Sequence, residues 1–246
     1  MNANFRTSKS EYRDIGDKLN EFNELGSAQS LVRYYEGASP DDMWAVPSLG
    51  IDPATGAEMF RKKDGSQTFI YSTADEVVVG CSRPDVEGVI GSSFYYKGFS
   101  ASVNFRYRLG GEVMASALYS KVENISEEQI YYNQDKRALH DRWQKPGDRT
   151  DVPRFVLEQG AGPQNSSRYI HSTDHIRLKN LTLGFTLPGR WVQKALIENA
   201  RVYFSGSNLL TWAKWKQYDP EVPVNGEVFC EAPPMRTFNF GVEITF

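Results

Sequence analysis

Four tryptophans are the residues of this sequence best suited to hold a ligand, because they fall in segments predicted to connect strands. They are Trp44, Trp143, Trp212 and Trp215. An indole face can stack on a sugar ring or against a partner protein, and its N–H can donate a hydrogen bond. The same side chains could instead form the cores of the loops or part of an aromatic girdle. The sequence leaves both roles open.

The histidines and acidic residues do not form a pattern typical of a metal site or of catalysis. His171 and His175 are four residues apart in a loop or strand rather than on one helical face, and His140 is far from both. Residues 52–56 lack the alternating acidic ligands of a calcium loop and predict a turn. The sequence contains no nucleophile elbow, no Gly-rich loop ahead of a helix and no identifiable acid–base pair. We therefore expect no metal, no cofactor and no enzymatic activity.

The composition excludes some classes of protein and leaves a membrane barrel open. Charged residues make up 24% of the chain, the net charge is -3 and the mean hydropathy is -0.52. No window approaches the roughly 18 apolar residues that a membrane helix needs, and no basic patch predicts binding to nucleic acid. Mean hydropathy does not detect a membrane-barrel strand, because only every second side chain of such a strand faces lipid.

The last residues of the chain, 236–246, separate two chemically opposite faces. The apolar face consists of Phe238, Phe240, Val242, Ile244 and Phe246. The intervening residues are polar or glycine, and successive strand side chains point to opposite faces. This pattern is typical of the closing strand of an outer-membrane barrel. Residues 99–109 repeat it, with Arg106 and Arg108 on the polar face.

Short and long connections alternate between the predicted strands. We expect strands at residues 2–8, 89–97, 99–109, 174–187, 200–207 and 236–246. Lys97-Gly98 indicates a tight hairpin, and a phase shift near 179–180 predicts a β-bulge. The short connections, 97–98 and 188–199, would then face the periplasm.

The long connections would face the cell exterior. They are 31–87, 110–173 and 208–235. The first contains a predicted small hairpin around Asp64-Gly65. Cys81 and Cys230 lack the spacing of a zinc or redox motif, so two independent thiols are expected. Both fall on the predicted exterior side, so a disulfide between them is the alternative.

The predicted fold class is all-β, an antiparallel transmembrane β-barrel segment with long extracellular loops. About six strands cannot close a membrane barrel, since the smallest use about eight. An open edge in lipid would leave backbone groups unpaired, so further strands must complete the wall. The alternative is a soluble carbohydrate-binding β-sandwich, which would bury the apolar face against a second sheet and use the loop tryptophans.

Several stretches, spread over nearly the whole chain, carry a family resemblance. They are Trp44–Gly56, Tyr96–Ser100, Phe105–Gly111, Asp141–Asp148, Ile176–Pro188, Arg201–Thr211, Tyr218–Glu221 and Phe240–Phe246. Taken in this order, they resemble the carboxyl-terminal barrel of the SusC/RagA family of TonB-dependent outer-membrane transporters.

The resemblance implies a barrel of about 22 strands closed by an amino-terminal plug. It also implies import of oligosaccharides or peptides, a SusD-like surface lipoprotein over the mouth, and energy from the TonB complex. Residues 1–9 lack the features of a signal peptide, so we expect residues 1–246 to be the carboxyl-terminal part of the barrel. The signal peptide, the TonB box and the plug would lie outside this chain.

The carboxyl terminus itself resembles a recognition signal. Phe246 follows alternating apolar residues, as in the signal that the barrel-assembly machinery recognises in outer-membrane proteins. We therefore expect the chain to lie in the cell outer membrane, in contact with its lipid. The expected partners are the plug and remaining strands of the same protein, the SusD-like lipoprotein, the TonB complex and the barrel-assembly machinery.

Overall fold

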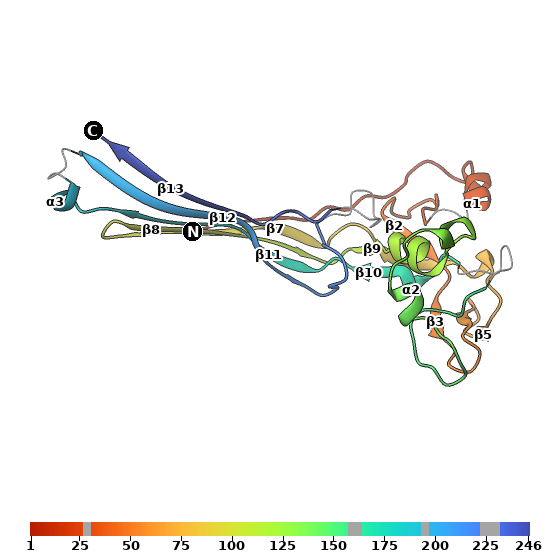
Figure 1. Cartoon of the computed structure of the whole chain (residues 1–246). Coiled ribbons are helices and arrows are strands. Elements are labelled where there is room, and N and C mark those ends of the chain that lie inside the picture. Colours follow the sequence, from red (N-terminus) through yellow and green to blue (C-terminus); the bar gives the residue numbers. More distant parts are fainter. Residues whose placement is uncertain (27–30, 157–163, 193–196, 222–231) are drawn as a thin grey trace.

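A long antiparallel sheet forms one region of the chain, and the long connections fold into a second region beside one of its ends (Figure 1). The computed structural model describes residues 1–26, 31–156, 164–192, 197–221 and 232–246. The sheet has six strands in the order β1-β7-β8-β11-β12-β13. They are β1 (Asn2–Arg6), β7 (Val86–Tyr96), β8 (Phe99–Leu109), β11 (His175–Thr186), β12 (Asn199–Ala213) and β13 (Thr237–Thr245).

The short connections lie at the end of the sheet that points away from the second region. Lys97 and Gly98 join β7 to β8 with φ values of 47° and 86°, and a two-residue hairpin turn favours positive φ because it matches the strand twist. The helix α3 (Gly189–Val192) lies between β11 and β12, and Figure 1 places it near the carboxyl terminus at this same end. The predicted alternation of short and long connections is therefore confirmed.

One face of the sheet is apolar and bare. Phe105 is paired with Leu178, and Val202 with Val242, so cross-strand neighbours extend the apolar face from strand to strand. Its large side chains remain exposed, including Phe5, Ile90, Phe94, Phe99, Ile176, Leu210, Trp212, Phe238, Phe240, Val242 and Ile244. A water-soluble sandwich would bury such a face.

The β-bulge predicted near Lys179 is confirmed, but β12 is longer than expected. The register shifts between Leu178 and Asn180 on β11. On β12, Asn208 has a φ of 54° at the same level. The ladder resumes beyond this irregularity and continues to the pair His175–Ala213. Pairing with β11 thus extends β12 into the segment predicted to be a loop.

The region formed by the long connections contains several small sheets. They are β2 (Asp42–Ala45) with β6 (Val77–Cys81), β3 (Ser48–Ile51) with β4 (Glu58–Arg61) and β5 (Gln67–Thr68), and β9 (Glu112–Met114) with β10 (Ile170–Ser172). The β4–β5 pair is the hairpin predicted around Asp64-Gly65. The β3–β4 pairing is another local hairpin, whereas the β2–β6 and β9–β10 pairings join residues far apart in sequence; none of these three was predicted.

Short helices complete this region, which we call the loop region. They are α1 (Asn20–Gly26), α2 (Arg137–His140), the π-helix η2 (Leu118–Glu123), and the 3-10 turns η1 (Thr73–Asp75), η3 (Glu128–Tyr131) and η4 (Ser167–Tyr169). Its buried apolar core includes Met43, Ala45, Val46, Phe60, Val113, Met114, Ala115, Ala117, Val122, Val152 and Tyr169. The loop region therefore buries its apolar side chains in the way of a water-exposed domain.

Across the described residues, no helix has the length and apolar character needed to span a membrane.

Candidate functional site

Cationic side chains gather on the polar face of the sheet, near the end that carries the long connections. Arg106 of β8 is directly opposite Arg177 of β11, and Arg108 is opposite His175. Lys179 adds a further charge from the bulge. Like charges at opposed positions destabilise a sheet. Carboxylates from another part of the chain must therefore compensate them.

Glu221, which lies beyond the end of β12, supplies one of these carboxylates. Its Oε2 accepts a hydrogen bond from Lys179 Nζ at 2.8 Å and lies 3.0 Å from Arg177 Nη1. Its Oε1 lies 3.7 Å from His175 Nε2 and 3.8 Å from Arg106 Nη1. Burial alone would raise the pKa of this carboxyl, but the adjacent His175 and Lys179 and the charge of Arg177 outweigh burial and lower the pKa to about 2. Glu221 is therefore ionised at neutral pH.

Asp219 supplies the second carboxylate. Arg177 Nη2 donates to both of its oxygens, each at 2.6 Å. The Arg177 side chain is only 1% exposed, and a guanidinium this buried is stable only when its charge is paired. Lys179, Arg177, Asp219 and Glu221 are called the ion cluster below. The cluster joins the segment after β12 to the polar face of the sheet.

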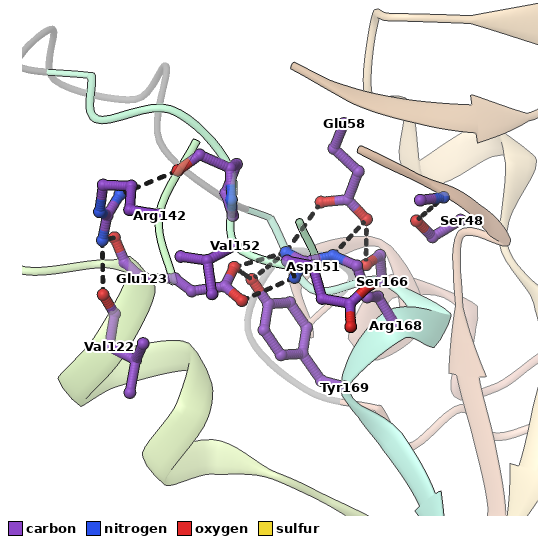
Figure 2. Close-up of polar contacts among 12 residues, drawn as sticks. Ser48, Glu58, Val122, Glu123, Arg142, Asp151, Val152, Ser166, Arg168 and Tyr169 are labelled. Atoms are coloured by element: carbon purple, nitrogen blue, oxygen red, sulfur yellow. Dashed lines mark hydrogen bonds and ion pairs between the residues drawn. The ribbon is translucent and has the colours of Figure 1, made fainter. Parts of the chain in front are cut away.

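A second set of buried charges lies inside the loop region (Figure 2). Arg168 donates to both oxygens of Glu123, at 2.6 and 2.5 Å, and Tyr169 Oη donates to the same carboxylate at 2.5 Å. Ser166 Oγ donates to Glu58 Oε1 at 2.6 Å, and Arg168 Nε lies 3.4 Å from the same oxygen. Burial raises the pKa of Glu123 and of Tyr169, and the charge of Arg168 opposes both shifts. These contacts connect η2, β4 and η4.

Arg142 ties this set of charges to the backbone. Its guanidinium donates to the carbonyl oxygens of Val122 at 2.5 Å, Ala138 at 2.9 Å and Pro153 at 3.2 Å. Its cation also lies over the Phe155 ring, 5.4 Å from the centroid. Arg142 therefore connects η2 and α2 to residues 152–153, which also pair with its own segment through the Arg142–Val152 bridge.

A cavity of ≈ 860 Å³ opens beside these charges. Glu123 and Arg168 line it, together with Arg137, His171 and Gln217. The rest of its lining is mostly charged or polar: His140, Asp141, Arg142, Gln144, Lys145, Asp148, Arg149, Thr150 and Asp151, with Leu118 and Val152. The lining offers hydrogen-bond donors and acceptors together with positive and negative charges, so the cavity suits a polar ligand.

Two of the candidate tryptophans pack within the loop region. Trp44 lies in β2 against Tyr35, with ring centroids 5.0 Å apart. Trp143 donates from Nε1 to the carbonyl of Pro53 at 3.0 Å. Its ring also covers Gly56, where an added Cβ would lie 2.4 Å from the indole. Both side chains are thus engaged in structural contacts.

The other two candidates lie at the junction between the sheet and the loop region. Trp212 belongs to β12 and lies on the apolar face, where it is 54% exposed, so its predicted place in a loop was wrong. Trp215 stacks on His171, with ring centroids 4.2 Å apart and planes inclined by 9°. The four tryptophans do not share one site, and a role in ligand binding stays a prediction for each.

The histidines occupy separate settings. His175 Nδ1 lies 2.8 Å from the Thr173 carbonyl, and His171 and His140 line the cavity. Burial, reinforced by the charge of Arg168, lowers the pKa of His171. Among the residues that the structure describes, no group of three or more His, Cys, Asp or Glu is arranged to hold a metal ion. Cys81 is a free thiol, and Cys230 lies outside the described residues.

The apolar residues of the closing strand lie along an edge of the sheet. Phe240 packs against Phe204 of β12, with ring centroids 5.1 Å apart, and is 80% exposed. Phe238, Val242 and Ile244 occupy the same apolar face, and Phe246 is exposed just beyond β13. Their role as an assembly signal stays a prediction.

The sequence alone does not reveal the ion cluster. Strand alternation placed Arg106 and Arg108, which lie outside the cluster, on the polar face, and the resemblance singled out Tyr218–Glu221, which includes its two carboxylates. No local pattern pairs Arg177 with Glu221, because the contact depends on how the chain turns after β12. The pairing therefore became visible only in three dimensions.

Comparisons with known proteins agree on one family. No family model matches the chain. TonB-dependent receptor P3 of Formosa agariphila is 28% identical over 226 residues, which cover 86% of this chain and 21% of that protein. TonB-dependent receptor SusC of Bacteroides thetaiotaomicron is 26% identical over 245 residues, which cover 96% of this chain and 22% of that protein.

A solved structure of the RagAB peptide transporter matches the fold with a TM-score of 0.76 and 26% sequence identity, over 99% of this chain and 27% of that chain. The chain thus spans about a fifth to a quarter of the length of the proteins it matches. These matches confirm the predicted resemblance to the SusC/RagA family of TonB-dependent transporters.

Proposed function

We propose that this chain forms the carboxyl-terminal wall of an outer-membrane β-barrel that imports oligosaccharides or peptides with energy from the TonB complex. Its six-stranded sheet is one part of the wall. The remaining strands and the plug belong to the rest of the same protein. The apolar face of the sheet contacts lipid, and the polar face lines the lumen.

The bare apolar face is the observation that carries this proposal. Soluble proteins rarely expose a contiguous apolar patch larger than about 300–600 Å². Here such side chains run across the whole sheet, from Phe5 on β1 to Val242 on β13. Exposure of this face to lipid carries no free-energy penalty, and the remaining strands of the barrel would pair with the free edges of β1 and β13.

The polar face supports its assignment to the lumen. Arg177 and Glu221 carry formal charges on the side of the sheet opposite the apolar residues. Charged side chains are costly on the lipid face of a barrel and are tolerated in the lumen. The short connections then lie in the periplasm and the loop region outside the cell.

The proposed partners follow from this orientation and from the family. A SusD-like surface lipoprotein would contact the loop region from the extracellular side. The TonB complex would act on a part of the protein outside this chain. The barrel-assembly machinery would recognise the closing strand, with Phe246 at its end.

The proposed substrate class is broad, namely oligosaccharides or peptides. The polar lining of the cavity beside Arg168 is compatible with either. A related structure is that of a peptide transporter, and a related sequence is SusC. Among the candidate tryptophans, Trp215 is the best placed for a ligand contact, because it stacks on the cavity residue His171.

The alternative, a soluble carbohydrate-binding β-sandwich, requires a second sheet over the apolar face. Phe240 and Val242 on this face are 80% and 63% exposed in the described structure. This exposure favours the barrel over the sandwich.

The test is a comparison of two neighbouring positions on β13 in the complete receptor within outer membranes. With Cys81 and Cys230 replaced by serine, a nitroxide is attached at Val242→Cys or, as the matched control, at Asn239→Cys. We expect quenching of the Val242 label by oxygen, which partitions into lipid, and quenching of the Asn239 label by a water-soluble nickel chelate. Equal access of the chelate to both labels would contradict the proposal and favour the soluble module.

A further inference from the structure

The segment that follows β12, residues 215–221, crosses from the loop region to the polar face of the sheet. We call it the strap. The last backbone bond before it runs from the Lys214 amide to the Asp174 carbonyl, at 3.0 Å. Among the described residues, the strap makes no backbone–backbone hydrogen bond with another segment. Among these residues, side-chain contacts therefore attach the strap to its neighbours, whereas backbone hydrogen bonds attach a strand to its sheet.

The side chains at one end of the strap hold it against the sheet. Asp219 accepts two hydrogen bonds from Arg177, and Glu221 pairs with Arg177 and Lys179. The Asp219 carboxylate also accepts from the Glu221 amide at 2.9 Å, so the two acidic residues form one local turn. Loss of either carboxylate would leave a buried cation short of a partner.

The other end of the strap is held by the loop region. Arg137 of α2 donates to Tyr218 Oη at 3.0 Å and to Gln217 Oε1 at 3.2 Å. Trp215 stacks on His171, and both Arg137 and His171 line the cavity of the loop region. The strap thus links that cavity to the ion cluster.

There is room beside the strap for it to move. A second cavity, of ≈ 500 Å³, is lined by the strap, by the end of β12 and by residues that precede β13. Its lining residues are Thr211, Ala213, Trp215, Lys216, Gln217, Tyr218, Asp219, Pro220, Pro233 and Arg236. A displaced strap would enter space that no described side chain fills.

We infer that the strap is a gate on the polar face, held in its inward position by the ion cluster at one end and by Arg137 at the other. The inference rests on the proposed function, because the polar face must line the lumen for the strap to obstruct a passage. Release requires the sheet-side ion pairs to break, and a charged group of a passing solute can compete for them. Arg137 sets how far the released strap travels.

The inference is tested by measuring the distance between the strap and the sheet in the complete receptor. Nitroxides are placed at Lys216→Cys on the strap and Thr182→Cys on the polar face of β11, with the native cysteines replaced by serine. We expect one short-distance population in this background. E221Q should add a longer-distance population, and E221Q combined with R137Q should make the longer distance dominant.

The matched control is E87Q, which removes a carboxylate 3.7 Å from Arg106 on the same face but outside the strap. It should leave the distance unchanged, and resistance of the barrel to unfolding by detergent and heat should be retained in every variant. As a functional readout, a water-soluble thiol reagent should label the single cysteine Thr182→Cys faster in the double variant than in the parent protein.

The outcomes separate this inference from the proposed function. An unchanged distance in the double variant would overturn the gate, even where the label at Val242 is in lipid. A label at Val242 accessible to the nickel chelate would overturn the barrel itself. A lengthened distance without faster labelling of Thr182→Cys would show that the strap moves but does not obstruct access to the polar face, which also rejects the gate.

Discussion

Apolar side chains are buried in the loop region and exposed on the sheet. In the loop region Val46 and Val122 are 1% and 0% exposed, whereas on the sheet Phe240 and Val242 are 80% and 63% exposed. The loop region encloses its apolar residues, and the sheet displays them. The comparison supports the proposal that two parts of one chain are adapted to different solvents, water around the loop region and lipid around the sheet.

Charged residues show the same contrast. Both regions bury ion pairs, Arg168 with Glu123 in the loop region and Arg177 with Glu221 on the sheet. In the loop region the pair lies within a folded core and joins distant segments. On the sheet the pair is buried between the polar face and the strap, and it joins the two. The first pair is expected to serve stability, and the second to control the position of a segment.

The largest effect is expected inside the loop region. Glu123→Gln removes the nearer of the two carboxylates that pair with Arg168, and breaking a buried pair by removing one member costs about 3–5 kcal/mol. Local hydrogen exchange in β9 and β10 should rise accordingly, because Tyr169 and Arg168 adjoin these strands. The control Glu11→Gln removes a largely exposed pair with Arg13, which is worth about 0–1 kcal/mol. Equal protection in both variants would contradict a structural role for Glu123.

The second effect tests the sheet. Val242→Arg places a charge on the proposed lipid face, at a cost of about 2–4 kcal/mol near the middle of a bilayer. Asn239→Arg, on the polar face of the same strand, should be nearly neutral. The measurement is the free energy of unfolding of the complete barrel in lipid vesicles. Equal costs at the two positions would remove the distinction between the faces.

A smaller effect is expected at the end of the chain. Phe246→Ala removes an apolar side chain that is 85% exposed in this structure, with a loss of at most about 1.5–3 kcal/mol of lipid contact. The amount of receptor in the outer membrane should fall more than this stability loss explains, because the assembly signal is weakened. Phe238→Ala, on the same face but away from the terminus, is the control. Equal loss of receptor in both variants would reject a special role for the terminus.

The smallest effect concerns pH. The pKa of Glu221 is about 2, below its ordinary value of 4.5, so its stabilisation is fully present above about pH 4.5 and is lost as the pH falls towards 2. The mobility of a spin label at Lys216→Cys should therefore stay constant between about pH 5 and pH 8. It should increase below that range. A change near neutral pH would show that another group holds the strap.

Strand patterns were predictable because they are local. The alternation in 99–109 and 236–246, the Lys97-Gly98 hairpin and the bulge near Lys179 all depend on neighbouring residues and are confirmed. The end of β12 was not predicted, because its last residues pair with β11 only beyond the register shift. The small sheets β2–β6 and β9–β10 were not predicted either, because their strands are short and the paired strands are far apart in sequence.

By itself the sequence determined that this chain has two-faced antiparallel strands, short and long connections in alternation, and a family resemblance. The strands and their connections follow from side-chain alternation and turn chemistry within a few residues, and the resemblance follows from the order of short motifs along the chain. Only the tertiary structure decided that Glu221 reaches Arg177, that Arg168 joins Glu123, and that Trp212 and Trp215 lie in different environments. These contacts depend on how long connections return to the sheet, and no local interaction specifies that path.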